Sequence, residues 1–210
     1  MPRVGIMATN RIRTLRKIIS TIDSIAGLQV QESCVARVTI DLQNTWSQFS
    51  RALYLSSLLG SRLQSGRRAT VSNPCADIDD AIGRAVRQYR PSANPRPDGS
   101  WHRRDEPNWH DPNILLALLG SQNATILTSV QESLSSGYRV FLDLPVFRNY
   151  FAHRSQQNAE AARSVALRNG VAAAMKRPSD MLLTRPIGRP QSLLNDWIDE
   201  LQFTIDYVCI

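Results

Sequence analysis

Three side chains that could act together on a phosphate lie within one short segment of the chain. Residues 147–153 read FRNYFAH and contain Arg148, Asn149 and His153. An imidazole titrates near neutral pH and therefore serves as a general acid or base. A guanidinium donates two parallel hydrogen bonds to phosphate oxygens and stabilises the charge that develops on them. These residue types at this spacing predict an acid–base group beside a phosphate ligand.

The residues around this segment predict that a helix presents it. On an ideal helical wheel with Arg148 at zero, Asn149 falls at ~100° and His153 at ~140°, while the intervening aromatic residues fall on the opposite arc. We expect one helix over residues 143 to about 174, with its aromatic arc against the core. The wheel places three more polar residues on the arc of His153: Gln156, Glu160 and Arg163.

Other chemical patterns are missing from the sequence. It contains no phosphate-binding glycine loop, dinucleotide fingerprint, helical zinc-protease motif or serine nucleophile elbow. Its three cysteines, Cys34, Cys75 and Cys209, are widely spaced and do not have metal-ligand spacing. We therefore expect reduced thiols, no disulfide scaffold, no metal and no cofactor.

A second candidate segment is rich in proline, tryptophan and histidine. Residues 91–112 hold five of the eleven prolines and predict an exposed loop, which with residues 1–9 is expected to be the most mobile part of the chain. The aromatic residues Trp101, His102, Trp109 and His110 could stack on bases beside the arginines of this loop. Alternatively, the loop is simply solvated and its tryptophans pack down as anchors.

The composition favours a polyanionic partner. The chain has 25 Lys and Arg against 18 Asp and Glu, a formal net charge of +7. Only two of the basic residues are lysines, and we attribute this to a codon-composition bias of the source genome rather than to phosphate binding, which would also favour arginine. No run of 18 apolar residues occurs, so we expect no membrane-spanning segment. The basic N-terminus is not followed by a continuous apolar stretch, so it does not resemble a signal peptide, and we expect a cytoplasmic protein.

Hydrophobic periodicity predicts helices and little else. The clearest is over about 38–59, where Leu42, Trp46, Phe49 and Leu53 recur at helical steps. Others are expected over about 10–26, 77–89, 112–119, 121–136 and 191–208, with Asp111 as the N-cap that precedes Pro112. These segments predict an all-α protein, a single helical bundle over residues 1–210 with the proline-rich loop inserted in it.

The segment R148-N149-Y150-F151-A152-H153 resembles the motif of HEPN-domain ribonucleases, in which an arginine and a following polar residue precede a histidine by a few positions. The all-α composition and the late helix are similar too, so the resemblance implies a HEPN-like bundle. In one branch of that family a tyrosine lies two residues after the histidine and is adenylylated. Here that position is Ser155, so this control is not carried over.

The resemblance also implies an activity and its residues. HEPN nucleases cut RNA without a metal, by attack of the 2′-OH on the adjacent phosphate. His153 would move protons, Arg148 would stabilise the phosphoryl oxygens, and Asn149 would orient the histidine or the phosphate. The family implies a homodimer that acts on an RNA substrate as a toxin–antitoxin or antiviral defence effector, with a possible cognate antitoxin protein.

Two other interpretations remain open. The chain could be a non-catalytic helical protein–protein interaction module, in which Arg148 and His153 are structural. It could also be a helical DNA-binding module that uses Arg11, Arg13, Arg16 and Lys17, although the apolar residues between them are typical of a core face. We rank the ribonuclease first, the interaction module second and the DNA-binding module third.

Overall fold

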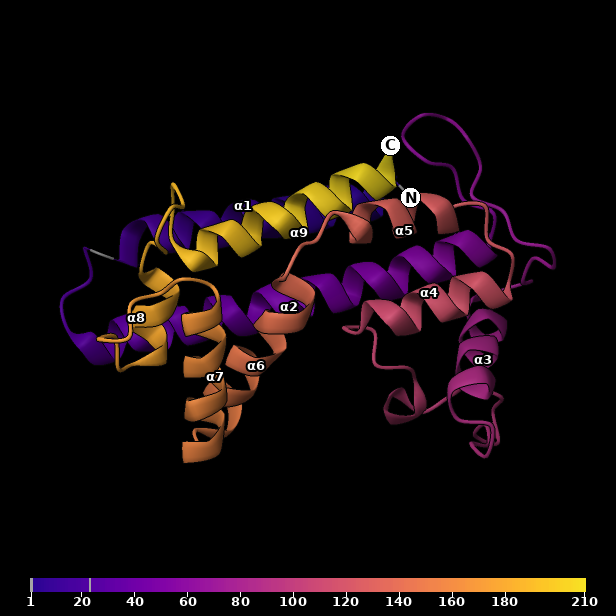
Figure 1. Cartoon of the computed structure of the whole chain (residues 1–210). Coiled ribbons are helices and arrows are strands. Elements are labelled where there is room, and N and C mark those ends of the chain that lie inside the picture. The colour runs from indigo at the N-terminus through magenta and orange to yellow at the C-terminus, as the bar shows by residue number, and fades with distance from the viewer. Residues whose placement is uncertain (1, 23) are drawn as a thin grey trace. The chain divides into compact units, whose positions relative to one another are not determined.

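The computed structural model describes residues 2–22 and 24–210, and helices form nearly all of its regular structure (Figure 1). This confirms the all-α class. Between the described residues no strand forms, apart from an isolated bridge that pairs Arg62 with Arg68. The helices are α1 (Pro2–Ile22), α2 (Leu28–Leu58), α3 (Ile78–Tyr89), the 3₁₀ turn η1 (Arg103–Asp105), α4 (Pro112–Ser121), α5 (Leu127–Ser135), α6 (Val140–His153), α7 (Gln156–Arg168), α8 (Pro178–Leu183) and α9 (Leu193–Cys209).

The chain forms two compact units. Unit 1 is built on Trp46–Gly137 together with the start of α1 and Thr204–Ile210, and it holds α3, α4 and α5. Unit 2 is built on Thr9–Thr45 and Tyr138–Phe203, and it holds α6, α7 and α8. The long helices α1, α2 and α9 contribute residues to both units. All three residues of the candidate motif belong to unit 2.

The apolar spacing of α2 is confirmed, but the helix is longer than expected. Leu42, Trp46, Phe49 and Leu53 are all buried. The helix begins at Leu28 rather than near residue 38. Its first turns carry exposed apolar side chains such as Leu28 and Val30, which do not follow the core period and therefore hid its start.

Of residues 1–9, which the sequence predicts to be mobile, Met1 lies outside the described residues and the rest form the first turns of α1. Proline suits the first helical position, because its missing N–H would have no partner there. Within α1, Gly5 is buried against α9, and a Cβ on it would lie 2.7 Å from the Sγ of Cys209. This glycine is therefore a site of close helix packing, and the helix continues through it.

Aspartate side chains cap the starts of two helices, of which the cap at Asp111 was predicted from the sequence. Asp77 accepts a hydrogen bond from the Asp80 amide at the start of α3 (2.8 Å), and Asp111 accepts one from the Asn113 amide at the start of α4 (2.9 Å). Each carboxylate satisfies a donor that the first helical turn leaves unpaired and interacts favourably with the helix dipole.

The proline-rich segment is irregular apart from η1, and it is anchored near its end. The Trp109 side chain is buried against Tyr54 of α2, with ring centroids 5.5 Å apart. Its indole donates to the buried carboxylate of Glu106, which also accepts two hydrogen bonds from Arg51 (2.6 and 3.1 Å). The sequence left open whether the tryptophans of this loop stack on bases or pack against the core. Trp109 packs against the core.

Candidate active site at the end of α6

The helix that carries the motif ends at the candidate histidine. Arg154 adopts the left-handed conformation (φ 46°, ψ 34°), and Ser155 then caps α7 by accepting a hydrogen bond from the Asn158 amide (3.2 Å). The expectation of one helix over 143–174 is therefore wrong. Serine is a strong N-cap residue, and this signal was masked by the good helix formers on both sides. As a consequence, the polar residues 156, 160 and 163 belong to α7 and do not continue the arc of His153.

Aromatic side chains fix α6 to the interior of unit 2. Phe147 is fully buried and meets the Trp197 ring of α9 edge to face, with centroids 5.5 Å apart. Phe151, one turn later, is buried as well and contacts Tyr150 at 5.1 Å. Edge-to-face pairs of this kind stabilise a packing geometry beyond the area they bury. The backbone beneath Arg148 and His153 is thus held in place by its opposite face.

A buried carboxylate joins α6 to α7. Asp143, in the first turn of α6, accepts hydrogen bonds from Arg139 (3.1 Å), Arg168 (2.8 Å) and Asn169 (2.7 Å). The last two donors lie at the end of α7, so the two helices form an antiparallel hairpin that is closed at both ends. His153 lies at the turn of this hairpin, and Asp143 closes the other end.

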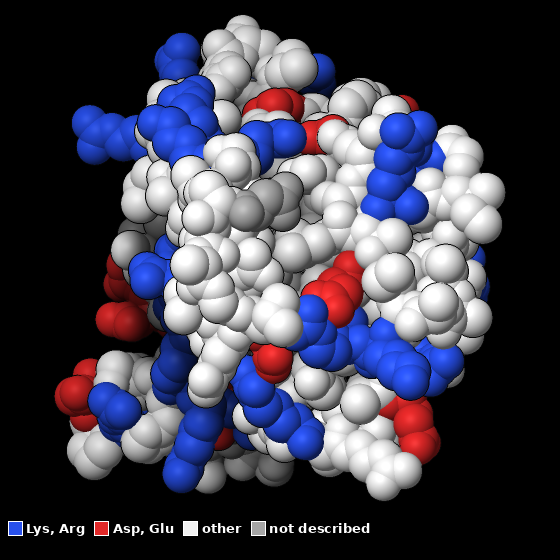
Figure 2. Space-filling model, turned by 90° about the vertical axis from the view of Figure 1, so that its left-hand side faces the viewer, with Lys and Arg blue, Asp and Glu red and all other residues white. Residues whose placement is uncertain are grey.

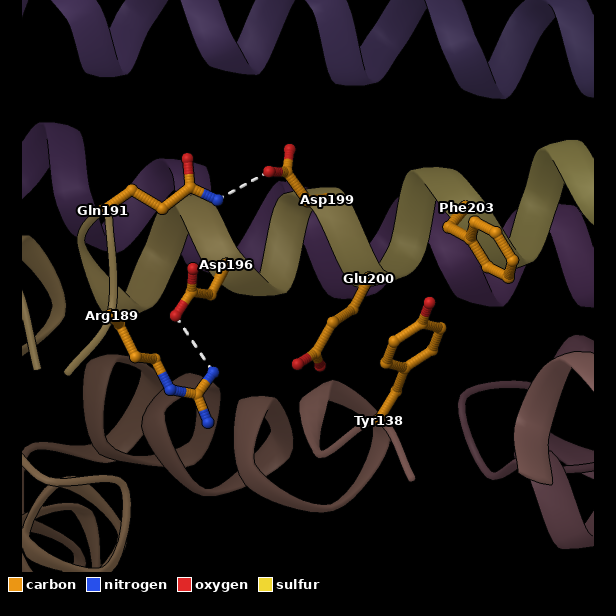
Figure 3. A pocket seen from close by; sticks show the side chains of 7 residues that line it. All are labelled: Tyr138, Arg189, Gln191, Asp196, Asp199, Glu200 and Phe203. Atoms are coloured by element: carbon orange, nitrogen blue, oxygen red, sulfur yellow. Dashed lines mark hydrogen bonds and ion pairs between the residues drawn. The ribbon is translucent and has the colours of Figure 1, made fainter. Parts of the chain in front are cut away.

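A side chain from α9 caps the start of α6. The residue before α6, Arg139, makes no side-chain cap, and the Glu200 carboxylate instead accepts hydrogen bonds from the amides of Arg139 (3.1 Å) and Val140 (2.9 Å). Burial raises the pKa of Glu200, while the two backbone hydrogen bonds act in the opposite direction. Figure 3 shows Glu200 reaching from α9 toward the start of α6.

Glu200 also lines a pocket of about 410 Å³ in unit 2 (Figure 3). The other acidic residues of the pocket are already engaged. Asp196 pairs with Arg189 (3.0 Å), and Asp199 accepts a hydrogen bond from Gln191 and pairs with Arg16. The acidic side chains of the pocket therefore have partners within unit 2, and Glu200 is the one that links α9 to the start of α6.

The motif residues themselves face solvent. His153 is exposed and, within the described chain, makes no hydrogen bond or ion pair, so its ring nitrogens are available to a ligand. Arg148 is half-buried, and its guanidinium approaches the side-chain oxygen of Asn149 at 3.5 Å. Arg148 and His153 are separated by ~140° around α6, so the two side chains leave the helix in different directions.

On the face that Figure 2 shows, uncharged residues cover most of the surface, and basic side chains are more prominent than acidic ones. Several of the arginines in unit 2 are balanced by acids, including Arg154 with Glu32 (2.8 Å) and Arg177 with Asp180 (2.8 Å). Arg148 has no acidic partner among the described residues, so its charge is available to an anion.

The solvent face of α6 is apolar before the motif begins. Leu142 is 64% exposed, and Pro145 and Val146 are half-buried beside it. On the wheel these three residues share an arc with Asn149 and His153. A single helix face therefore presents an apolar strip that leads into the candidate catalytic residues.

The remaining candidates lie in unit 1. His102 Nδ1 is hydrogen-bonded by Arg96 (3.0 and 3.2 Å), and the Trp101 ring lies 5.5 Å from the Arg87 guanidinium carbon. The carbonyl of His110 accepts a hydrogen bond from the Trp46 indole (3.2 Å). No group of three or more His, Cys, Asp or Glu in the described part of the chain is arranged to hold a metal ion. No described helix is long and apolar enough to cross a membrane.

Comparison of the chain with models of protein families, with curated proteins and with solved structures found no match. The chain is therefore described by its fold class, which is all-α. Its candidate site consists of Arg148 and His153 near the end of α6, in the hairpin that α6 forms with α7.

Proposed function

We propose that this chain is a metal-independent endoribonuclease of the HEPN type. The observation that supports this most directly is the position of His153. It is an unpaired, exposed imidazole on the last turn of a helix whose opposite face is buried. A buried structural histidine is normally hydrogen-bonded, whereas this exposed one makes no hydrogen bond or ion pair in the described chain. Arg148 and Asn149, one turn earlier, supply the phosphate and orienting groups.

The proposed reaction needs only the groups that this motif contains. The ribose 2′-OH attacks the adjacent phosphorus while an imidazole removes its proton, and the bond from phosphorus to the 5′ oxygen breaks as that oxygen is protonated. Arg148 donates to the non-bridging phosphoryl oxygens, whose charge rises in the transition state. The products are a 2′,3′-cyclic phosphate end and a 5′-OH end, so atoms and charge balance without a co-reactant.

We propose that two copies of the chain form the working site. Arg148 and His153 leave α6 in different directions. A phosphate bound by Arg148 of one copy would therefore lie close to His153 of the second copy. The apolar strip that leads into the motif, with Leu142 at its exposed end, gives this second copy a surface to cover. A two-fold axis beside α6 would place the motif of each copy against that of its partner.

We propose toxin–antitoxin or antiviral defence as the setting, with the cytoplasm as its place and cellular RNA as its substrate. A nuclease that needs no cofactor is active as soon as it folds, so the cell that makes it must restrain it. A cognate antitoxin protein that covers α6 would do this. The rival proposal, a non-catalytic interaction module, uses the same apolar strip and predicts partner binding without RNA cleavage.

The test is cleavage of labelled single-stranded RNA by the purified protein in excess EDTA. The proposal predicts cleavage, with product ends that alkaline phosphatase cannot dephosphorylate until acid opens the cyclic phosphate to a monophosphate. The same sequence in DNA, which lacks the 2′-OH, must remain intact. Absence of cleavage, or cleavage that EDTA abolishes, contradicts the proposal and favours the interaction module.

A further inference from the structure

A short basic hairpin projects from unit 1, and we call residues Arg62–Arg68 the basic arm. Two backbone hydrogen bonds, from Leu63 N to Arg67 O (2.8 Å) and from Ala69 N to Ser61 O (2.9 Å), flank the isolated bridge between Arg62 and Arg68. Gly66 makes the turn with φ 82°, a conformation that favours glycine.

The arm is fixed to its surroundings at the tip and at the base. At the tip, the amides of Gln64 and Ser65 donate to the carbonyls of Cys209 (3.1 Å) and Ile210 (3.2 Å) at the end of α9. At the base, Ala69 is fully buried, and the next residue, Thr70, exchanges backbone and side-chain hydrogen bonds with Thr125. The arm lies beside the end marked C in Figure 1. Its arginines are therefore carried by a backbone that is already ordered.

The charges of the arm are uncompensated. Arg62, Arg67 and Arg68 are all exposed, and none has an acidic partner among the described residues, whereas Arg51 and Arg84 of the same unit are paired with Glu106 and Asp80. Arg62 and Arg68 lie directly opposite each other in a pair without mutual backbone hydrogen bonds, where side chains come closest. Like charges in that position are destabilising, so an anion between them relieves a cost that the free protein carries.

We propose that the basic arm binds the phosphate backbone of RNA, as a contact site separate from the Arg148–His153 motif. Guanidinium groups bind phosphate oxygens through two parallel hydrogen bonds, which lysine cannot form. All three basic residues of the arm are arginines. The tip residues of the arm are Gln64, Ser65 and Gly66, none of which has a large apolar side chain of its own to enter a lipid surface. The arm reads charge and not base identity, so it adds affinity for any single strand.

This inference rests on the proposed function for its choice of RNA, and its test is kept separate from cleavage. Binding is measured by fluorescence anisotropy with a labelled 20-nucleotide 2′-O-methyl RNA, in which the attacking hydroxyl is blocked. The triple variant R62Q/R67Q/R68Q should raise Kd about tenfold and reduce the slope of log Kd against log salt by about 2, since each phosphate contact in a single strand contributes about 0.7.

The matched control removes the same charge elsewhere, in the exposed residues Arg37, Lys176 and Arg185 of unit 2. R37Q/K176Q/R185Q should keep the wild-type slope, and neither variant should melt below the wild-type temperature. Equal losses in the two triple variants, an unchanged slope in the arm variant, or absence of binding by the wild type would overturn the inference. So would binding of phosphatidylglycerol vesicles that depends on the arm while RNA binding does not. If the wild type binds the blocked RNA through the arm but leaves ordinary RNA intact, the nuclease proposal fails and this inference stands.

Discussion

The side-chain amide of Asn169 donates a 2.7 Å hydrogen bond to the carboxylate of Asp143, and both residues are buried. This contact ties the residue after α7 to the first turn of α6. It therefore closes the α6–α7 hairpin at the end opposite His153. Arg139 and Arg168 complete the set of donors to the same carboxylate, so three side chains depend on one buried charge.

Replacing this carboxylate should destabilise the protein clearly. Asp143→Ala leaves the buried amide of Asn169 without its acceptor, and we expect a loss of about 3 kcal/mol in the free energy of unfolding. Arg139 and Arg168 are partly exposed and can turn to water, which keeps the loss from being larger. The control is Asp180→Ala, whose ion pair with Arg177 is open to solvent, and there we expect less than about 1 kcal/mol. Equal losses in urea unfolding would contradict the role given to Asp143.

The turn after His153 stores backbone strain. Arg154 occupies the left-handed region at a cost that glycine does not incur. Both Arg154→Gly and Arg154→Ala remove the ion pair with Glu32, so their difference isolates the backbone. We expect the glycine variant to be more stable than the alanine variant by about 1 kcal/mol in chemical unfolding. An alanine variant that is equally stable would show that the turn is not strained.

Acid should weaken the anchor of the proline-rich segment. Burial alone would raise the pKa of Glu106, but the hydrogen bonds from Arg51 and Trp109 outweigh it and hold that pKa below its ordinary value. The folded state therefore binds fewer protons than the unfolded state, and the stabilisation is complete above the ordinary glutamate pKa and lost as the pH falls through the lowered one. In urea unfolding near neutral pH, the free energy of unfolding of the wild type should exceed that of Glu106→Gln by about 2 kcal/mol. This difference should disappear in acid. A gap that stays constant with pH would exclude this account.

Much of the fold could be predicted from the sequence because the helices follow from local features, namely hydrophobic spacing and capping residues. The helical steps of Leu42, Trp46 and Phe49 predict a buried face of α2, and Asp111 predicts the start of α4 by cap chemistry. Burial of Phe147 and Phe151 followed from the same wheel that exposes His153.

The rest could not be predicted because it depends on partners distant in sequence. The three donors to Asp143 lie on both sides of a turn that the helix propensities conceal, although an aspartate in the apolar run FLDLP is an unusual residue that invites a search for partners. Glu200 of α9 caps the start of α6, although it lies sixty residues further along the chain, and no local sequence pattern predicts such a contact. The close approach of Cys209 to Gly5 is likewise a long-range contact.

Mixing two inactive variants tests the proposed two-chain site. Arg148→Ala retains His153, and His153→Ala retains Arg148, so a mixed dimer holds one complete pair if the two residues act across the two-fold. Random exchange of subunits should then restore about a quarter of the wild-type cleavage rate. Light scattering at micromolar concentration should show a dimer. A 23.5 kDa monomer that cleaves RNA, or a mixture that stays inactive, would place both residues in one chain.

The most direct measurement of the central claim is the rate of RNA cleavage by His153→Ala in excess EDTA. Because His153 is exposed, its loss should leave the melting temperature unchanged, and Gln157→Ala, an exposed neighbour at the start of α7, is the matched control. The account predicts that the control cleaves at the wild-type rate, while His153→Ala loses roughly 10²- to 10⁴-fold in rate, the contribution of a general acid–base group. A folded His153→Ala protein that cleaves RNA at the wild-type rate would contradict it.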